Sequence, residues 1–202
     1  ALAAPLTKAQ KLEDFDQLLY RIHSGYGPLI YKQQNNIIAL ESLEQNYRNL
    51  VQATKSNSDF YYLIRRFVAE FRDGHFRATL PTDYVSYVPV ATDLVNGQVL
   101  ITAIDKTWAD ANKFDFALGD AIVGVDGLPI DQFLAENARM VGAGYDLTER
   151  RKAAWFVFFR QASLVPAPQG EVEISIFRFS TNKVETVKLP WDHTGTYLDE
   201  NA

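Results

Sequence analysis

Hydrophobic side chains recur at helical spacing through the first 80 residues of the chain. The clearest stripe runs at intervals of three and four residues through Phe60, Leu63, Ile64, Phe67, Val68 and Phe71. Such spacing predicts an amphipathic helix, and Asp73-Gly74 predicts its end, with Gly74 suited to a left-handed cap position. Similar stripes cover residues 12–22, after a Thr7/Gln10 capping box, and residues 37–53. We therefore expect residues 1–80 to form a small helical bundle.

The pattern changes after Pro81 to the alternation that is typical of strands. Residues 84–90 and 98–104 predict two strands joined by an Asn96-Gly97 turn, and residues 171–179 and 184–189 predict a second pair. Between them, residues 131–140 and 147–160 predict two helices. The fold class is α+β, with a mixed module over residues 81–202.

Composition narrows the possible functions. The 202 residues carry a net charge of −5, which disfavours nucleic acid as a partner. No apolar run approaches the roughly 20 residues of a membrane span. The absence of cysteine excludes disulfides, thiolate catalysis and cysteine-based zinc sites, and nothing in the sequence predicts a metal or a cofactor.

The chain begins Ala1-Leu2-Ala3-Ala4-Pro5, with small residues of the kind that signal peptidases prefer. This segment predicts an exported, periplasmic or secreted bacterial protein whose signal peptide has been removed. A simple flexible terminus would have the same sequence.

His75 is the candidate for chemistry. It lies in Phe71-Arg-Asp-Gly-His-Phe-Arg77, where the third helix gives way to extended chain. An imidazole fixed by a tight turn is suited to act as the base of a serine hydrolase. A helix stop followed by a surface histidine explains the same residues.

The segment Phe116-Ala-Leu-Gly-Asp-Ala-Ile-Val-Gly-Val-Asp-Gly-Leu-Pro-Ile130 closely resembles the centre of a bacterial PDZ domain. This resemblance implies a partly open β-barrel with inserted helices, and protein or peptide partners.

A PDZ ligand adds a strand to an exposed sheet edge, which makes Tyr87, Val88, Val90 and Ala91 the candidate peptide-binding residues. Pro89 interrupts this edge because it has no N–H to donate. The glycine-containing carboxylate loop that usually precedes the edge strand is not evident. The Trp155–Phe159 aromatic run is expected to be core rather than groove.

The order of helical bundle, Asp-Gly-His and PDZ-like module resembles the N-terminal portion of a family S41 serine peptidase. By that resemblance, His75 is the general base for a serine on a C-terminal catalytic domain that is absent from this chain. The chain alone is expected to be inactive and to serve substrate recognition or regulation. Two alternatives remain open: a non-catalytic peptide-binding or scaffolding module, and a PDZ-like module that only packs against the bundle.

Overall fold

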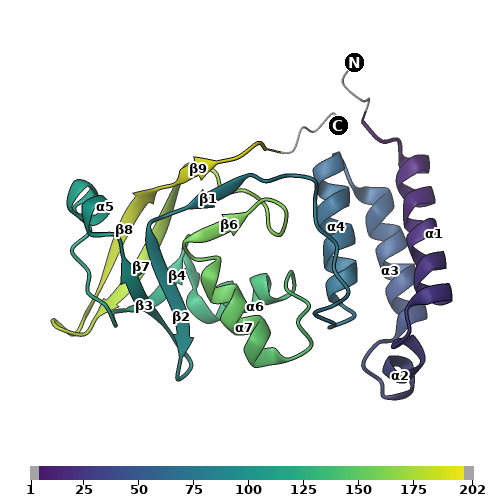
Figure 1. Ribbon diagram of the computed structural model, residues 1–202, viewed down its shortest axis with the longest axis horizontal. Helices are drawn as coiled ribbons and strands as arrows, with labels where there is room; N and C mark the ends of the chain where they lie inside the picture. The colour runs from purple at the N-terminus through teal and green to yellow at the C-terminus, as the bar shows by residue number, and fades with distance from the viewer. Residues whose placement is uncertain (1–4, 198–202) are drawn as a thin grey trace.

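A computed structural model describes residues 5–197 and places a group of helices beside a β-rich module (Figure 1). The helices are α1 (Lys8–Gly25), α2 (Leu29–Gln34), α3 (Leu40–Ala53) and α4 (Asn57–Ala69). Residues 1–4, on which the signal-peptidase prediction rests, lie outside the described residues. Within residues 5–197, no helix is both long and apolar enough to cross a membrane.

Capping boxes fix where two of these helices begin. Gln10 N donates to Thr7 Oγ1 at 3.3 Å, and Thr7 N donates to Gln10 Oε1 at 2.9 Å. Ser56 and Asp59 form the same reciprocal pair at the start of α4. Each box provides acceptors for N–H groups that a helix N-terminus leaves without intrahelical partners. The capping box predicted at Thr7 is confirmed.

Two antiparallel sheets form the β-rich module. The larger has the order β2 (Val90–Val95), β3 (Gln98–Ile104), β4 (Ala121–Val125), β7 (Glu171–Arg178) and β8 (Lys183–Pro190), and the short β5 (Leu128–Pro129) pairs with β4. The smaller has the order β6 (Phe159–Gln161), β1 (Val85–Tyr87) and β9 (Asp192–Thr194). The helices between these strands in the chain are α5 (Lys106–Asn112), α6 (Ile130–Ala138) and α7 (Asp146–Trp155). The sheets stay open rather than closing into a barrel, and the predicted α+β class with an N-terminal helical bundle is confirmed.

Two predicted elements are shorter in the structure because the chain bends. The strand expected at residues 84–90 is split at Pro89, which has no N–H for a ladder. β1 belongs to the smaller sheet and β2 to the larger. The helix expected at 147–160 ends at Trp155, and Phe159 already pairs with Tyr87 in β6.

The left-handed residue after α4 is Arg72, with φ of 51°, and not Gly74 as the sequence suggested. The N–H of Arg72 donates to Ala69 O at 2.9 Å, so the chain must turn directly after the helix. Side-chain contacts hold Arg72 there, since its guanidinium pairs with Asp146 and lies 3.6 Å from Glu149 Oε1.

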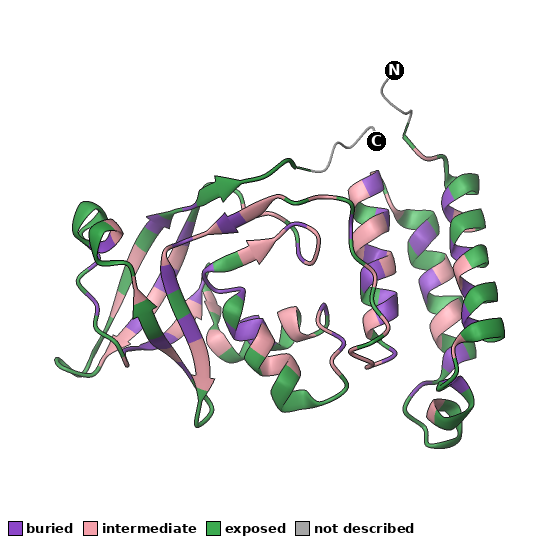
Figure 2. Cartoon of the chain, in the orientation of Figure 1, coloured by how far each residue is buried: buried purple, intermediate pink, exposed green. Residues whose placement is uncertain are grey.

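The chain buries two separate hydrophobic cores, and Figure 2 shows their buried positions on the inward faces of the helices and along the strands. The bundle core is rich in aromatic rings: the ring centroids of Phe15 and Phe67 are 5.0 Å apart, edge to face, and Phe67 and Phe71 are 5.5 Å apart. Aromatic pairs of this geometry add stability beyond the area they bury. The second core lies between the larger sheet and helices α6 and α7.

Helix α4 joins the two modules through the face opposite its bundle core. Tyr62 Oη donates to Ala162 O at 2.7 Å. The buried Arg65 donates from Nε to Leu164 O and from Nη2 to Met140 O, both at 2.8 Å. Its Nη1 donates to Ala78 O. One guanidinium therefore ties α4 to three separate segments of chain.

The loop between α6 and α7 approaches the end of α4 so closely that only glycine fits. A Cβ on Gly142 would lie 2.7 Å from the Cα of Ala69, and a Cβ on Gly144 would lie 2.5 Å from Arg72 O. Both glycines also have positive φ, at 59° and 85°. Gly142 and Gly144 thus lie in the turn between α6 and α7, and this turn packs on the bundle.

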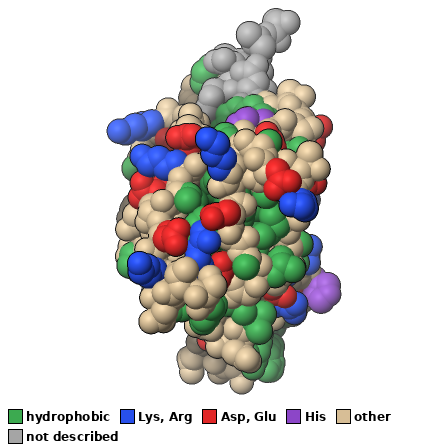
Figure 3. All heavy atoms as spheres, turned by 90° about the vertical axis from the view of Figure 1, so that its left-hand side faces the viewer, with side chains coloured by type: hydrophobic (Ala, Val, Ile, Leu, Met, Phe, Trp, Pro, Cys, Tyr) green, Lys and Arg blue, Asp and Glu red, His purple; other side chains and the backbone are tan. Residues whose placement is uncertain are grey.

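Acidic and basic side chains are interspersed over the β-rich end of the molecule (Figure 3). In this module, Arg178 Nη2 lies 2.7 Å from Asp115 Oδ1 and its Nε lies 3.1 Å from Glu185 Oε1. The carboxylates of these pairs lie at the surface, where solvent limits what an ion pair contributes to stability.

Gly144→Ala should lower the free energy of unfolding more than Gly97→Ala. Gly97 has a similar φ of 81°, and nothing lies within 4 Å of a Cβ added there. Gly97→Ala therefore measures only the cost of a left-handed backbone for alanine, about 1–2 kcal/mol. At Gly144 the clash with a backbone oxygen adds about 1–3 kcal/mol. Urea unfolding followed by circular dichroism gives both values. Equal losses would show that the α6–α7 loop moves off α4 without cost.

Candidate functional site

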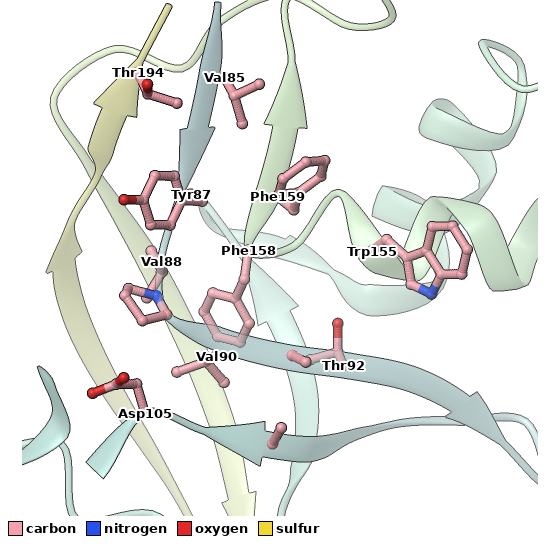
Figure 4. Close-up of a pocket in the computed structure, with 13 residues that line it drawn as sticks. Val85, Tyr87, Val88, Val90, Thr92, Asp105, Trp155, Phe158, Phe159 and Thr194 are labelled. Atoms are coloured by element: carbon pink, nitrogen blue, oxygen red, sulfur yellow. The ribbon is translucent and has the colours of Figure 1, made fainter. Parts of the chain in front are cut away.

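An apolar groove of about 890 Å³ opens where β1 gives way to β2 (Figure 4). Its walls come from β1, β2 and the start of α5 on one side, and from the end of α7 and β6 on the other. Val85, Tyr87, Val88, Pro89, Val90, Ala91, Thr92, Ala103, Asp105, Trp155, Phe158, Phe159 and Thr194 line it. Asp105 is the single charged residue among them.

Pro89 forms the corner from which the groove is built. Val88 N donates to Phe158 O at 2.9 Å, and Asp105 N donates to Pro89 O at 2.9 Å. Val90 N turns back to Val88 O at 2.6 Å. These bonds hold the chain in place as it passes from one sheet to the other, so the groove floor is fixed by backbone geometry.

All four residues that the sequence nominated for peptide binding line this groove. Ala91 is exposed and Tyr87 is half-buried, whereas the side chains of Val88 and Val90 are buried in the core of the module. These four residues do not form one continuous edge strand, because the chain breaks at Pro89 between β1 and β2. The free edge belongs to β2, which ends the larger sheet.

Trp155 and Phe159 form the opposite wall and were missed as groove residues. They are 49% and 42% exposed, while Phe156, Val157 and Phe158 between them are buried. The run expected to be core is therefore divided between core and groove. The sequence pattern does not reveal this division between core and groove, because the helical periodicity continues through residue 160. In the structure, α7 ends at Trp155 and β6 begins at Phe159.

Three side-chain hydrogen bonds join β2 to α7 beyond the groove. Thr92 Oγ1 donates to Ala154 O at 2.8 Å. Arg151 binds both carboxylate oxygens of Asp93, at 2.7 and 2.6 Å, and this hydrogen bonding lowers the pKa of Asp93. The helix beside the groove is thus α7, and it is tied to β2 at Thr92 and Asp93.

His75 lies apart from the groove on the turn that follows α4. Its side chain is 102% exposed, and its Nδ1 lies 3.4 Å from Asp73 Oδ1. The same oxygen accepts the N–H of His75 at 2.9 Å, while Tyr26 Oη donates to Asp73 Oδ2 at 2.8 Å. The backbone hydrogen bond from His75, followed by the bond from Tyr26, lowers the pKa of Asp73. The turn therefore presents an exposed imidazole beside a carboxylate that stays ionised.

A smaller pocket of about 270 Å³ lies between the two regions. It is lined by Gly74, which precedes His75, and it shares Trp155 and Phe159 with the groove. His75 itself lines neither space. Within residues 5–197, no three His, Asp or Glu side chains are grouped closely enough to hold a metal ion.

Comparison with solved structures shows the same overall fold in CPAF. A structure of mature CPAF complexed with lactacystin and a crystal structure of mature CPAF each give a TM-score of 0.78 at 21% sequence identity, covering 93% of this chain and 35% of theirs. The chain thus spans about a third of the length of the CPAF chains it matches.

Comparison of sequences gives the family. No curated protein matches the chain. A family model described as PDZ domain matches residues 84–201, a span that begins with β1 and contains the groove. This chain belongs to the PDZ domain family.

Proposed function

We propose that the groove binds an extended apolar segment of a peptide, and that the chain is the substrate-recognition part of a serine endopeptidase of the S41 type. The observation that carries the proposal is the pair of exposed aromatic rings, Trp155 and Phe159, which line an apolar groove together with the start of β2. Exposed rings that line a hollow beside a free strand edge are suited to hold the side chains of an added strand.

The geometry limits how such a peptide gains affinity. Pro89 removes one N–H before β2, and the Asp93–Arg151 pair joins α7 to β2 four residues later. Because Val90 N already donates to Val88 O, main-chain pairing is restricted to about residues 91 and 92. Contacts of side chains with Trp155, Phe159 and Tyr87 must then supply most of the binding energy, as aromatic anchors commonly do.

His75 is the general base in this proposal. An exposed imidazole on a fixed turn is free to accept the proton of a serine hydroxyl, and the carboxylate of Asp73 beside Nδ1 favours the tautomer that leaves Nε2 as the acceptor. The serine would come from a catalytic domain elsewhere in the protein. Its attack on the scissile carbonyl gives an acyl-enzyme, which water then hydrolyses.

The alternative of a non-catalytic peptide-binding module shares the groove and differs only at His75. The fold likeness to CPAF and the S41-like order of bundle, Asp-Gly-His and PDZ domain support the peptidase. Activity of the intact protein separates the two.

Phe159→Ala should weaken binding of apolar heptapeptides about tenfold, or ~1.4 kcal/mol, because it removes one wall of the groove. Phe179→Ala is the matched control, since Phe179 is 53% exposed but lies outside the groove. Fluorescence polarisation with labelled peptides measures both. If the two variants bind the peptides with equal affinity, the groove is excluded as the binding site.

His75→Ala should reduce kcat of the intact protein at least about 10⁴-fold, because the nucleophile loses its base. His23→Ala provides the control, since its Nε2 pairs with Glu44 Oε1 at 2.6 Å on the bundle surface. Hydrolysis of a fluorogenic peptide is the readout. Full activity of His75→Ala would indicate a Ser/Lys type of peptidase.

A further inference from the structure

The pocket between the bundle and the PDZ domain, hereafter the interdomain pocket, is unusual in its charge. Three cations line it: Arg65 from α4, Arg77 from the segment after α4, and Lys152 from α7. No acidic residue of the described chain is among its lining residues, which otherwise are Gly74, Thr79, Val141, Trp155, Phe156, Phe159, Gln161 and Leu164.

These cations differ from most arginines of the chain. Arg48, Arg72, Arg150, Arg151, Arg160 and Arg178 each contact a carboxylate. By contrast, Arg77 donates its Nε to the carbonyl of Gly74. Neither Arg77 nor Lys152 forms an ion pair with a carboxylate of residues 5–197. In an acidic protein, this is a local concentration of unpaired positive charge.

Arg65 makes the pocket a built site rather than a surface patch. Its side chain is buried, with 7% of the residue exposed, and each guanidinium nitrogen donates to one carbonyl. A guanidinium has further N–H groups beyond these three bonds. Burial, and next the charge of Arg77, lower the pKa of Arg65 to about 10. An anion bound in the pocket would raise the pKa of Arg65 again, and so would offset the effects of burial and of Arg77.

The usual place for a peptide carboxylate in this family is not available here. The segment before β2 would have to offer free N–H groups, but Val88 N donates to Phe158 O and Val90 N donates to Val88 O. Pro89 between them has no N–H. A carboxylate on a bound peptide must therefore find its positive partner elsewhere, and the interdomain pocket begins where the groove ends, at Trp155 and Phe159.

We propose that the interdomain pocket binds a carboxylate of the peptide whose apolar residues lie in the groove, with Arg77 and Lys152 as its ion-pair partners and Arg65 as the buried donor behind them. The proposal rests on the proposed peptide binding in the groove. The aromatic walls and the volume of about 270 Å³ suit one residue, which bears the carboxylate either at the chain terminus or on an Asp or Glu side chain.

The test compares three forms of each of a set of fluorescein-labelled heptapeptides that end in Ala, Val, Leu or Phe. The first form has a free terminal carboxylate, the second is amidated, and the third is extended by one added Glu residue whose own terminus is amidated. We expect the free acid to bind about tenfold more tightly than the amide, and more so at low salt. Recovery of this affinity by the third form assigns the site to a side-chain carboxylate as well. Failure to recover it assigns the site to the terminal carboxylate.

The Arg77→Gln/Lys152→Gln double variant locates the carboxylate. It should abolish the difference between acid and amide while leaving the affinity of the amide unchanged. Arg66→Gln is the control, since Arg66 is an exposed cation of the same helix as Arg65 and does not line the pocket. Arg65 is left intact because it holds the two modules together.

Each remaining outcome contradicts a specific part of the account. If acid, amide and glutamate forms bind equally to the unaltered chain, the carboxylate site is wrong while the groove stands. If the preference for the acid survives in the double variant, the carboxylate binds elsewhere. If no peptide binds in any form, the proposed function itself fails.

Discussion

The guanidinium of Arg65 is the contact on which the arrangement of the two modules depends. It binds the carbonyls of Ala78, Met140 and Leu164, which belong to segments far apart in the sequence. It does so from the face of α4 that is turned away from the bundle core. A buried carbonyl that loses its donor costs about 1–3 kcal/mol, so these bonds strongly favour one placement of the PDZ domain against the helices. The glycines of the α6–α7 loop allow the backbones to approach closely enough for the bonds to form.

This single placement brings three features close to one another. The groove at the start of β2, the interdomain pocket and the turn that carries His75 are contributed by different modules. Trp155 and Phe159 line both hollows, and Gly74 connects the second hollow to the histidine. In the proposed function, a peptide bound in the groove would therefore have one end near the bundle.

The sequence predicts elements best where one periodicity persists. The stripe from Phe60 to Phe71 correctly placed α4, and the alternation in β7 and β8 placed both strands. Pattern alone failed at bends. Pro89 lies in an otherwise strand-like run, and only the tertiary hydrogen bonds that Val88 N donates and Pro89 O accepts reveal that the chain changes sheets there. The aromatic run after Trp155 fits a helix equally well, because pairing of Phe159 with β1 is a long-range contact. The candidate strand residues were found from the family resemblance, whereas the two aromatic anchors and the cations of the pocket required the fold.

The central claim is that one ligand contacts both the groove and the surface beside the bundle. Amide and indole resonance mapping by NMR, during titration with an apolar heptapeptide that has a free terminal carboxylate, tests it most directly. The account predicts shifts for the indole of Trp155, for the amides of residues 90–92 and 159–161, and for those of residues 74–77 in the same titration. Shifts confined to the outer faces of α1 and α3, or to the far edge at β8, would contradict it.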